Sequence, residues 1–208
     1  MAIEVKKYDL GPLEENTYLV TDVDTGYKAV IDPGYFGKSI LADIGDPNSL
    51  KYVLLTHGHF DHFFNAEQYL SNFDSAKFVA PLKDKPLMDQ GVNTEFSSYG
   101  YRHPPCPTAD LYITEGDVIK LGNTKFQFIE TPGHTIGSMC IITGNILFSG
   151  DTLFRLSVGN TSFETGDFNA LINSIKNKLY TLNDDVVVYT GHGMDTTIGY
   201  EKGNNPFV

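Results

Sequence analysis

The feature that most constrains this chain is a run of three histidines and one aspartate within six positions, His57-Gly58-His59-Phe60-Asp61-His62. Imidazoles and a carboxylate packed this closely repel one another or lack hydrogen-bond partners unless a cation lies between them. Neutral imidazole and carboxylate are ligands that Zn(II), Fe(II) and Mn(II) accept. The chain must therefore fold so that this run faces a metal site.

The neighbouring sequence indicates where the run lies. It follows a buried-strand pattern over 51–55 and precedes a helical pattern. At the carboxyl end of a strand, His57 and His59 can point into one site, and we interpret Gly58 as relieving crowding between them. Asp61 and His62 then stand in the opening turn of a helix and can aim at a second point nearby. This spacing predicts two adjacent positions for metal ions.

Three later strand ends repeat one arrangement, in which a glycine directly precedes a candidate ligand: Gly133-His134, Gly150-Asp151 and Gly191-His192. Glycine suits a sharp turn and close packing around an ion. A lone histidine at a strand end is usually an ordinary core or surface residue, but beside the first run we interpret all three as ligands. His103 stands next to prolines without this context, and we do not count it as a ligand.

Short apolar runs bounded by turn residues predict the secondary structure. Strands are expected over 2–8, 17–22, 27–32, 51–56, 77–80, 111–113, 117–121, 125–131, 138–143, 145–149 and 186–190, and helices over 38–44, 62–73, 83–89 and 167–182. The last helix has Asp167 placed to cap its start. Strands interrupted by helices predict sheets covered by helices, in a single domain over 1–208. The segment 91–108 is expected to be a long loop with a functional role.

Composition narrows the class of partner. The net charge is -11, whereas a protein that binds nucleic acid needs a basic face. No apolar run approaches the roughly 20 residues that span a bilayer, and no signal-peptide pattern opens the chain. We therefore expect a cytoplasmic protein with a small-molecule substrate and no nucleic-acid or membrane partner; the oligomeric state is left open. Cys106 and Cys140 lack metal-type spacing and are expected to be reduced.

The run His-x-His-x-Asp-His, followed in order by His134, Asp151 and His192, resembles the metallo-β-lactamase superfamily over nearly the whole chain. The resemblance implies an α/β fold, the four-layer αβ/βα sandwich, with the site at one edge between the sheets. It also implies two divalent metal ions, with Zn(II) expected first and Fe(II) or Mn(II) as alternatives.

The same resemblance implies how the ligands divide. The first metal would take His57, His59 and His134. The second would take Asp61, His62 and His192, and Asp151 would bridge both, which makes Asp61 and Asp151 the candidate catalytic carboxylates. True β-lactamases commonly have a cysteine at the bridging position, so antibiotic hydrolysis is disfavoured.

Within the superfamily, four segments resemble the glyoxalase II-like hydrolases, which cleave hydroxyacyl thioesters of glutathione: 16–19, 31–34, 150–154 and 197–207. This resemblance implies that a hydroxide bridging the two metals attacks the thioester carbonyl. Asp32 would support a metal ligand or simply form an Asp-Pro-Gly turn, and both readings stay open.

Two differences from the glyoxalase II-like hydrolases concern the thiol that carries the acyl group in the thioester substrate. The chain ends sixteen residues after His192, so we expect no counterpart of the C-terminal helical domain that helps to grip glutathione. Neutral Asn160 and Ser162 also stand where related proteins often carry a basic residue and Tyr or Asp. A carrier other than glutathione is therefore expected. Arg155 and Asn160 are the candidate substrate contacts, although a surface ion pair would explain Arg155 equally well.

Other activities on the same scaffold stay open. Persulfide dioxygenases resemble it but use one Fe(II), which His57, His134 and Asp151 would hold here. Lactonases and phosphodiesterases use the same kind of metals, and the acidic charge disfavours nucleic-acid substrates. Flavodiiron reductases commonly have a glutamate where His59 stands, and a non-catalytic module would be expected to have lost ligands.

Overall fold

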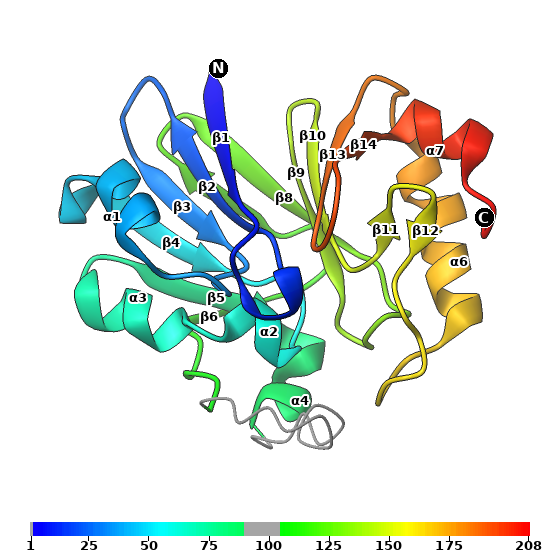
Figure 1. Ribbon diagram of the computed structural model, residues 1–208, viewed down its shortest axis with the longest axis horizontal. Coiled ribbons are helices and arrows are strands. Elements are labelled where there is room, and N and C mark those ends of the chain that lie inside the picture. Colours follow the sequence, from blue (N-terminus) through cyan, green and yellow to red (C-terminus); the bar gives the residue numbers. More distant parts are fainter. Residues whose placement is uncertain (1, 90–104) are drawn as a thin grey trace.

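The computed structural model, in which residues 2–89 and 105–208 are described, consists of two six-stranded sheets packed face to face with helices on both outer faces (Figure 1). The four layers are helices, sheet, sheet and helices. This confirms the αβ/βα sandwich that the family resemblance implies, and the sheets covered by helices that the strand and helix pattern predicts. Among the described helices, none combines the length and the apolar character that a bilayer span needs.

The first sheet has the strand order β1-β2-β3-β4-β5-β6. Its strands are β1 (Ile3–Tyr8), β2 (Thr17–Asp22), β3 (Lys28–Ile31), β4 (Leu50–Leu54), β5 (Lys77–Pro81) and β6 (Leu111–Ile113). Strands β1 to β3 form an antiparallel meander, and β3 to β6 run parallel. Parallel neighbours need crossover connections, and the helices of this half lie in them: α1 (Lys38–Ile44), α2 (Phe60–Phe63), α3 (Ala66–Asn72) and α4 (Lys85–Asp89).

The second sheet has the order β14-β13-β10-β9-β8-β7. Its strands are β7 (Val118–Leu121), β8 (Thr124–Glu130), β9 (Met139–Thr143), β10 (Ile146–Gly150), β13 (Val187–Thr190) and β14 (Thr196–Thr197). A small hairpin of β11 (Leu153–Phe154) and β12 (Ser157–Val158) follows β10. Helix α6 (Phe168–Asn177) connects this hairpin to β13, which pairs parallel with β10, and α7 (Ile198–Asn204) follows β14.

Three apolar clusters hold the layers together. The cluster between the sheets is rich in aromatic side chains, and the rings of Tyr18 and Phe148 meet edge to face with centroids 5.3 Å apart. A second cluster packs α1, α2 and α3 on the first sheet, and a third packs α6 and α7 on the second. Two-sided burial explains why strands such as β4 are apolar on both faces.

Most of the predicted elements are present. All eleven predicted strands exist, and helix 38–44 has its predicted bounds. The predicted helix 167–182 is shorter, because α6 ends at Asn177 and a separate 3-10 turn follows at 179–181. Asp167 caps α6 as expected, since its side chain accepts a hydrogen bond from the Ala170 amide.

Other predicted boundaries were wrong. The predicted helix 62–73 is two helices, α2 and α3, because Asn65 leaves helical geometry and bonds to the loop at 33–34. Helix 83–89 begins as a 3-10 turn over 82–84. Strands β11, β12 and β14 and helix α7 were not predicted. The segment 91–108, including His103, lies largely outside the described residues.

Candidate metal centre

Four strand ends of the two sheets meet at one edge of the sandwich and carry the predicted ligands there. The run from His57 to His62 follows β4: residues 57–59 form a loop with His59 at the N-cap of α2, and Asp61 and His62 lie in α2 itself. His134 follows β8, Asp151 follows β10 and His192 follows β13. The structure brings all seven predicted ligands together, and all but His192, whose side chain is 26% exposed, are largely buried.

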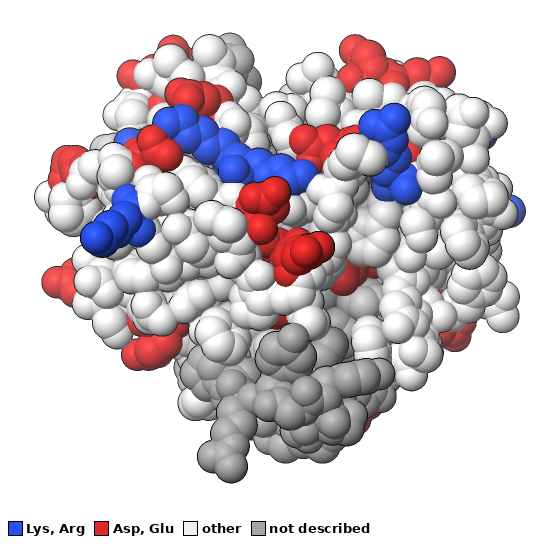
Figure 2. Space-filling view, viewed as in Figure 1, with Lys and Arg blue, Asp and Glu red and all other residues white. Residues whose placement is uncertain are grey.

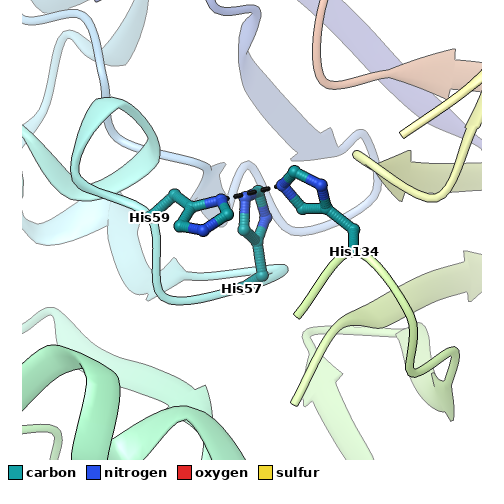
Figure 3. Close-up of side chains that lie close together, drawn as sticks. All are labelled: His57, His59 and His134. Atoms are coloured by element: carbon teal, nitrogen blue, oxygen red, sulfur yellow. Dashed lines mark hydrogen bonds between the residues drawn. The ribbon is translucent and has the colours of Figure 1, made fainter. Parts of the chain in front are cut away.

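The first group consists of His57, His59 and His134, whose nearest ring nitrogens all lie within 4.8 Å of one another. Figure 3 shows the three rings converging from the loop after β4 and the loop after β8. The His59 Nδ1 and the His134 Nε2 are 2.8 Å apart. Three imidazoles facing one point match the first metal position inferred from the sequence.

The second group consists of Asp61, His62 and His192, whose ligand atoms also lie within 4.8 Å of one another. The Asp61 Oδ2 lies 3.3 Å from the His192 Nε2 and 3.8 Å from the His62 Nε2. Both histidines therefore present Nε2 toward one carboxylate, at the position inferred for the second metal.

Asp151 faces both groups. Its Oδ1 lies 3.4 Å from the His62 Nε2 in the second group. Its Oδ2 lies 3.4 Å from the His134 Nε2 in the first group and 3.6 Å from the His192 Nε2 in the second. A carboxylate with this placement can share its oxygens between two cations.

Outer contacts orient the imidazoles. Asp32 lies with its Oδ2 2.9 Å from the His62 Nδ1 and accepts hydrogen bonds from both the amide and the hydroxyl of Thr56. The backbone oxygens of Asn160 and Leu13 lie 2.6 Å and 3.1 Å from the Nδ1 of His134 and His192. A proton held on Nδ1 by such an acceptor leaves Nε2 free for an ion. Asp32 therefore contacts a candidate ligand as well as forming a turn.

Burial and neighbouring charges shift the pKa values of several candidate ligands and so set their protonation states. Burial lowers the pKa of His57 well below its ordinary value, with His62 adding to the effect, and burial and His134 lower the pKa of His59 to about 3. Burial opposes the charged form of Asp151, but His192 and His62 outweigh it and hold the pKa of that carboxyl well below its usual range. His57 and His59 therefore offer neutral imidazoles, and Asp151 is a carboxylate.

The donor set fits divalent cations. Six buried side-chain atoms have no hydrogen-bond partner among the described residues, and five of them belong to candidate ligands: His57 Nε2, Asp61 Oδ1, His62 Nδ1, His62 Nε2 and Asp151 Oδ1. A buried polar atom without a partner costs roughly 1–3 kcal/mol, so five in one place would be expensive without a ligand. Imidazole nitrogens and carboxylate oxygens are suitable ligands for Zn(II), Fe(II) and Mn(II).

Glycines allow the close approach around these groups. A Cβ on Gly191 would lie 2.1 Å from the Asp151 Oδ1, so any larger residue would collide with the bridging carboxylate. A Cβ on Gly58 would lie 3.1 Å from the Asp84 Cβ and the Met88 Cγ, so this glycine makes room for α4 and for the turn before it.

Asp84 is a residue of the site that the sequence did not reveal. It is fully buried, and its Oδ2 accepts hydrogen bonds from the Gly58 amide at 2.8 Å and the Thr135 hydroxyl at 2.7 Å. Its Oδ1 accepts from the Gly137 amide at 2.7 Å. One carboxylate thus joins the loop of His57 and His59 to the loop of His134. No local pattern marks it, because its partners are distant in sequence.

The two predicted substrate contacts, Arg155 and Asn160, differ in whether the side chain is available to a substrate. Arg155 is exposed, its guanidinium carbon lies 5.3 Å from the centre of the Tyr200 ring, and it forms no ion pair with any residue of the described ranges. The surface ion pair considered as an alternative is therefore not seen there. The side chain of Asn160 instead closes a turn, accepting from the amide and hydroxyl of Ser162, and only its backbone oxygen reaches His134.

The profile of the metallo-beta-lactamase superfamily matches residues 10–192, a span that includes all seven predicted ligands. The chain belongs to this superfamily. Its members are metal-dependent hydrolases, and the clusters of histidine and aspartate described above suit a dinuclear site of the superfamily.

Relatives of this metallo-beta-lactamase superfamily chain match it nearly end to end. Hydroxyacylglutathione hydrolase GloC from Haemophilus influenzae is 36% identical, with 94% of this chain and 93% of that protein covered. The B3 metallo-beta-lactamase BLEG-1 has a TM-score of 0.89 at 31% identity, covering 98% of this chain and 99% of BLEG-1. TTHA1623, solved in a di-iron-bound form, has a TM-score of 0.85 at 34% identity, covering 98% and 100%.

Proposed function

We propose that this protein is a dinuclear metal-dependent hydrolase that cleaves thioesters of small thiols, including hydroxyacyl thioesters. The observation that carries the proposal is the position of Asp151, whose carboxylate faces His134 of the first ligand group and both His62 and His192 of the second. The relative named hydroxyacylglutathione hydrolase supports the choice of thioesters. The proposed ligands are His57, His59 and His134 for one cation and Asp61, His62 and His192 for the other, with Asp151 shared.

Cations bound there would supply hydroxide near neutral pH, by lowering the pKa of water, and Lewis acidity toward a carbonyl oxygen. The chain shields most of the centre from water, because Phe163 packs edge-on against His59 with ring centroids 5.5 Å apart and every candidate imidazole except that of His192 is buried. The balance is simple: the acyl carbon gains the oxygen of water, the C–S bond breaks, and the thiolate leaves with the sulfur electron pair and takes one proton.

The leaving group explains why no protein acid is needed. A thiol has a pKa near 8.5, so its thiolate is a stable leaving group close to neutral pH. An amine or alkoxide is a much poorer leaving group without a proton donor, so a centre that supplies hydroxide and Lewis acidity suits thioesters best.

The substrate can enter beside His192. An open pocket of about 320 Å³ is lined there by Phe154, Arg155, Leu156, His192, Gly193 and Met194. Arg155 stacks on Tyr200 and can meet an acid group of the substrate. On the face shown in Figure 2, basic side chains form a short row flanked by acidic ones and no broad basic surface. This distribution supports a small molecule as substrate.

The metal ions proposed are Zn(II) first, with Fe(II) or Mn(II) as alternatives. All three accept imidazole and carboxylate ligands. The di-iron form of TTHA1623 supports iron as the main alternative.

The test combines metal analysis of the purified protein with a substrate panel. The panel holds S-lactoylglutathione, the lactoyl thioester of N-acetylcysteamine, a lactone and a β-lactam, and oxygen uptake with a persulfide is followed in parallel. We expect two metal ions per chain, thioester cleavage, and faster turnover of the carrier that is not glutathione. D151N should lose activity, whereas D195N, which alters a half-buried aspartate paired with Lys7 outside the candidate metal groups, should keep it.

Other results would contradict the proposal. One iron per chain with thiol-dependent oxygen consumption would identify a dioxygenase. Cleavage of the lactone or the β-lactam with no cleavage of any thioester would identify a different hydrolase; the β-lactam is included because of the similarity to BLEG-1.

A further inference from the structure

Leu156 has an unusual backbone at the tip of the hairpin formed by β11 and β12. Its φ is +57°, in the left-handed region, and its side chain is 41% exposed. A residue with a Cβ is strained in this region, whereas glycine adopts it freely. An exposed leucine here therefore combines backbone strain with apolar surface in water, and neither contributes to the stability of the fold.

The strained turn is firmly held. The Leu156 amide donates a hydrogen bond to the Glu201 Oε2 at 2.9 Å. Glu201 is buried on α7 and also accepts from the Thr196 hydroxyl at 2.5 Å and the Asn205 side-chain amide at 2.9 Å. Strain persists where the surroundings fix it in this way, and such positions cluster at ligand sites.

Leu156 lines the pocket that contains His192, together with Phe154 and with Met194, which is 66% exposed. Leu13, on another segment beside His192, also has a left-handed backbone, with a φ of +59°, and an exposed apolar side chain, 41% exposed. Its backbone oxygen lies 3.1 Å from the His192 Nδ1. Two strained, exposed leucines thus flank the one candidate ligand with substantial solvent exposure.

We propose that this pocket binds an apolar group of the substrate directly beside the reacting carbonyl, and that Leu156 determines the preference for it. The inference rests on the proposed thioester hydrolase. We assign the apolar group to the acyl chain, and an apolar thiol carrier would present the same chemistry from the other side of the sulfur. The continuity of the pocket with the metal centre through His192 supports a substrate as the occupant.

The test compares L156G with L156A and with T165G. Thr165 also has a left-handed backbone, φ +70°, and is exposed, but it lies outside the residues that line the pocket. T165G also removes the hydroxyl that accepts from the Ile136 amide, so it serves as a control for substrate preference and not for stability. The substrates are the acetyl and hexanoyl thioesters of N-acetylcysteamine and the acetyl thioester of hexanethiol, compared by kcat/KM with the metal-loaded protein.

We expect the wild type to prefer hexanoyl over acetyl, and L156G to reduce that ratio by roughly tenfold or more. The unfolding temperature of L156G should be unchanged or higher, because glycine relieves the strain. L156A should lose the same preference without the gain in stability, and T165G should keep it. A ratio unchanged in both Leu156 variants would overturn the inference, and a preference found only with hexanethiol would overturn the assignment to the acyl chain.

A binding measurement separates this inference from the proposed function. Hexanoate and acetate are titrated calorimetrically into the metal-loaded protein. Tighter binding of hexanoate that L156G abolishes would support the apolar pocket even if no thioester is cleaved. Thioester cleavage accompanied by equal binding of the two acids would overturn the pocket and leave the proposed function standing.

Discussion

Replacing Asp84 with asparagine removes one acceptor from the carboxylate that joins the two loops of the first histidine group. In D84N, one oxygen becomes an amide nitrogen. If it replaces Oδ2 it faces the Gly58 amide, and if it replaces Oδ1 it faces the Gly137 amide. In either orientation, a backbone N–H of a loop that carries a candidate ligand loses its acceptor and meets another donor.

The structure sets the size of the effect. Asp84 is fully buried, so water cannot replace the lost acceptor. A buried donor left without a partner costs about 1–3 kcal/mol, and we expect D84N to lose that much free energy of unfolding. Changes in groups that orient metal ligands typically cost ~10–100-fold in metal affinity. We expect that loss at His57, His59 and His134, and little change at the other group.

The assay is a competition titration with a chromophoric chelator, which resolves the two dissociation constants, together with chemical denaturation of the metal-free protein. D22N is the matched control. Asp22 is also a buried carboxylate that accepts several hydrogen bonds, from Thr25, Asn123 and Thr124, and it lies outside the candidate metal groups. D22N should lose comparable stability and keep both metal affinities.

The reasoning would be refuted if D84N and D22N lowered stability alike and neither altered metal binding. It would also be refuted if D84N weakened both metal positions equally. The first result would make Asp84 a purely structural residue, and the second would mean that the two ligand groups are not held independently.

Two further predictions concern the second group. D32A should weaken metal retention there by ~10–100-fold, because the His62 Nδ1 loses the carboxylate at 2.9 Å; metal content after dialysis measures this, and undiminished content would contradict it. Metal affinity should also rise with pH. Burial alone would lower the pKa values of His62 and His192, but Asp151 and the other nearby carboxylates outweigh burial and raise both pKa values. At a pH below these raised pKa values a metal ion must displace a proton from each histidine, and at a pH above them it need not. Calorimetric titrations at pH 6 and pH 8 test the sign, and equal affinities would count against it.

The strands were predictable because the alternation of apolar runs and turn residues is local. Elements whose boundaries depend on contacts distant in sequence were not predictable in this way. Asn65 breaks a sequence that reads as one helix, because its amide bonds to the Pro33 oxygen in another loop. Helix α7 contains Gly199 and Gly203, which lower its helical propensity, and it forms where Ile198 is buried in the apolar cluster that also contains α6 residues.

For the site, the seven candidate ligands were found because metal chemistry restricts them to a few residue types at strand ends. Residues that support them were harder to find. Asp84 and Glu201 are ordinary acidic residues in the sequence, and only the fold shows that both are buried acceptors for loops of the site. The strain at Leu156 was also invisible, since nothing in the sequence reports a backbone dihedral.

The two sheets contribute unequal fragments of the centre. The first half carries His57, His59, Asp61 and His62, and the second half carries His134, Asp151 and His192, so neither half alone holds a complete ligand group. Cations bound at this seam would act as cross-links between segments far apart in the chain. Metal binding would therefore require the two halves to be docked. Loss of metal would lower the stability of the whole sandwich as well as its catalytic activity.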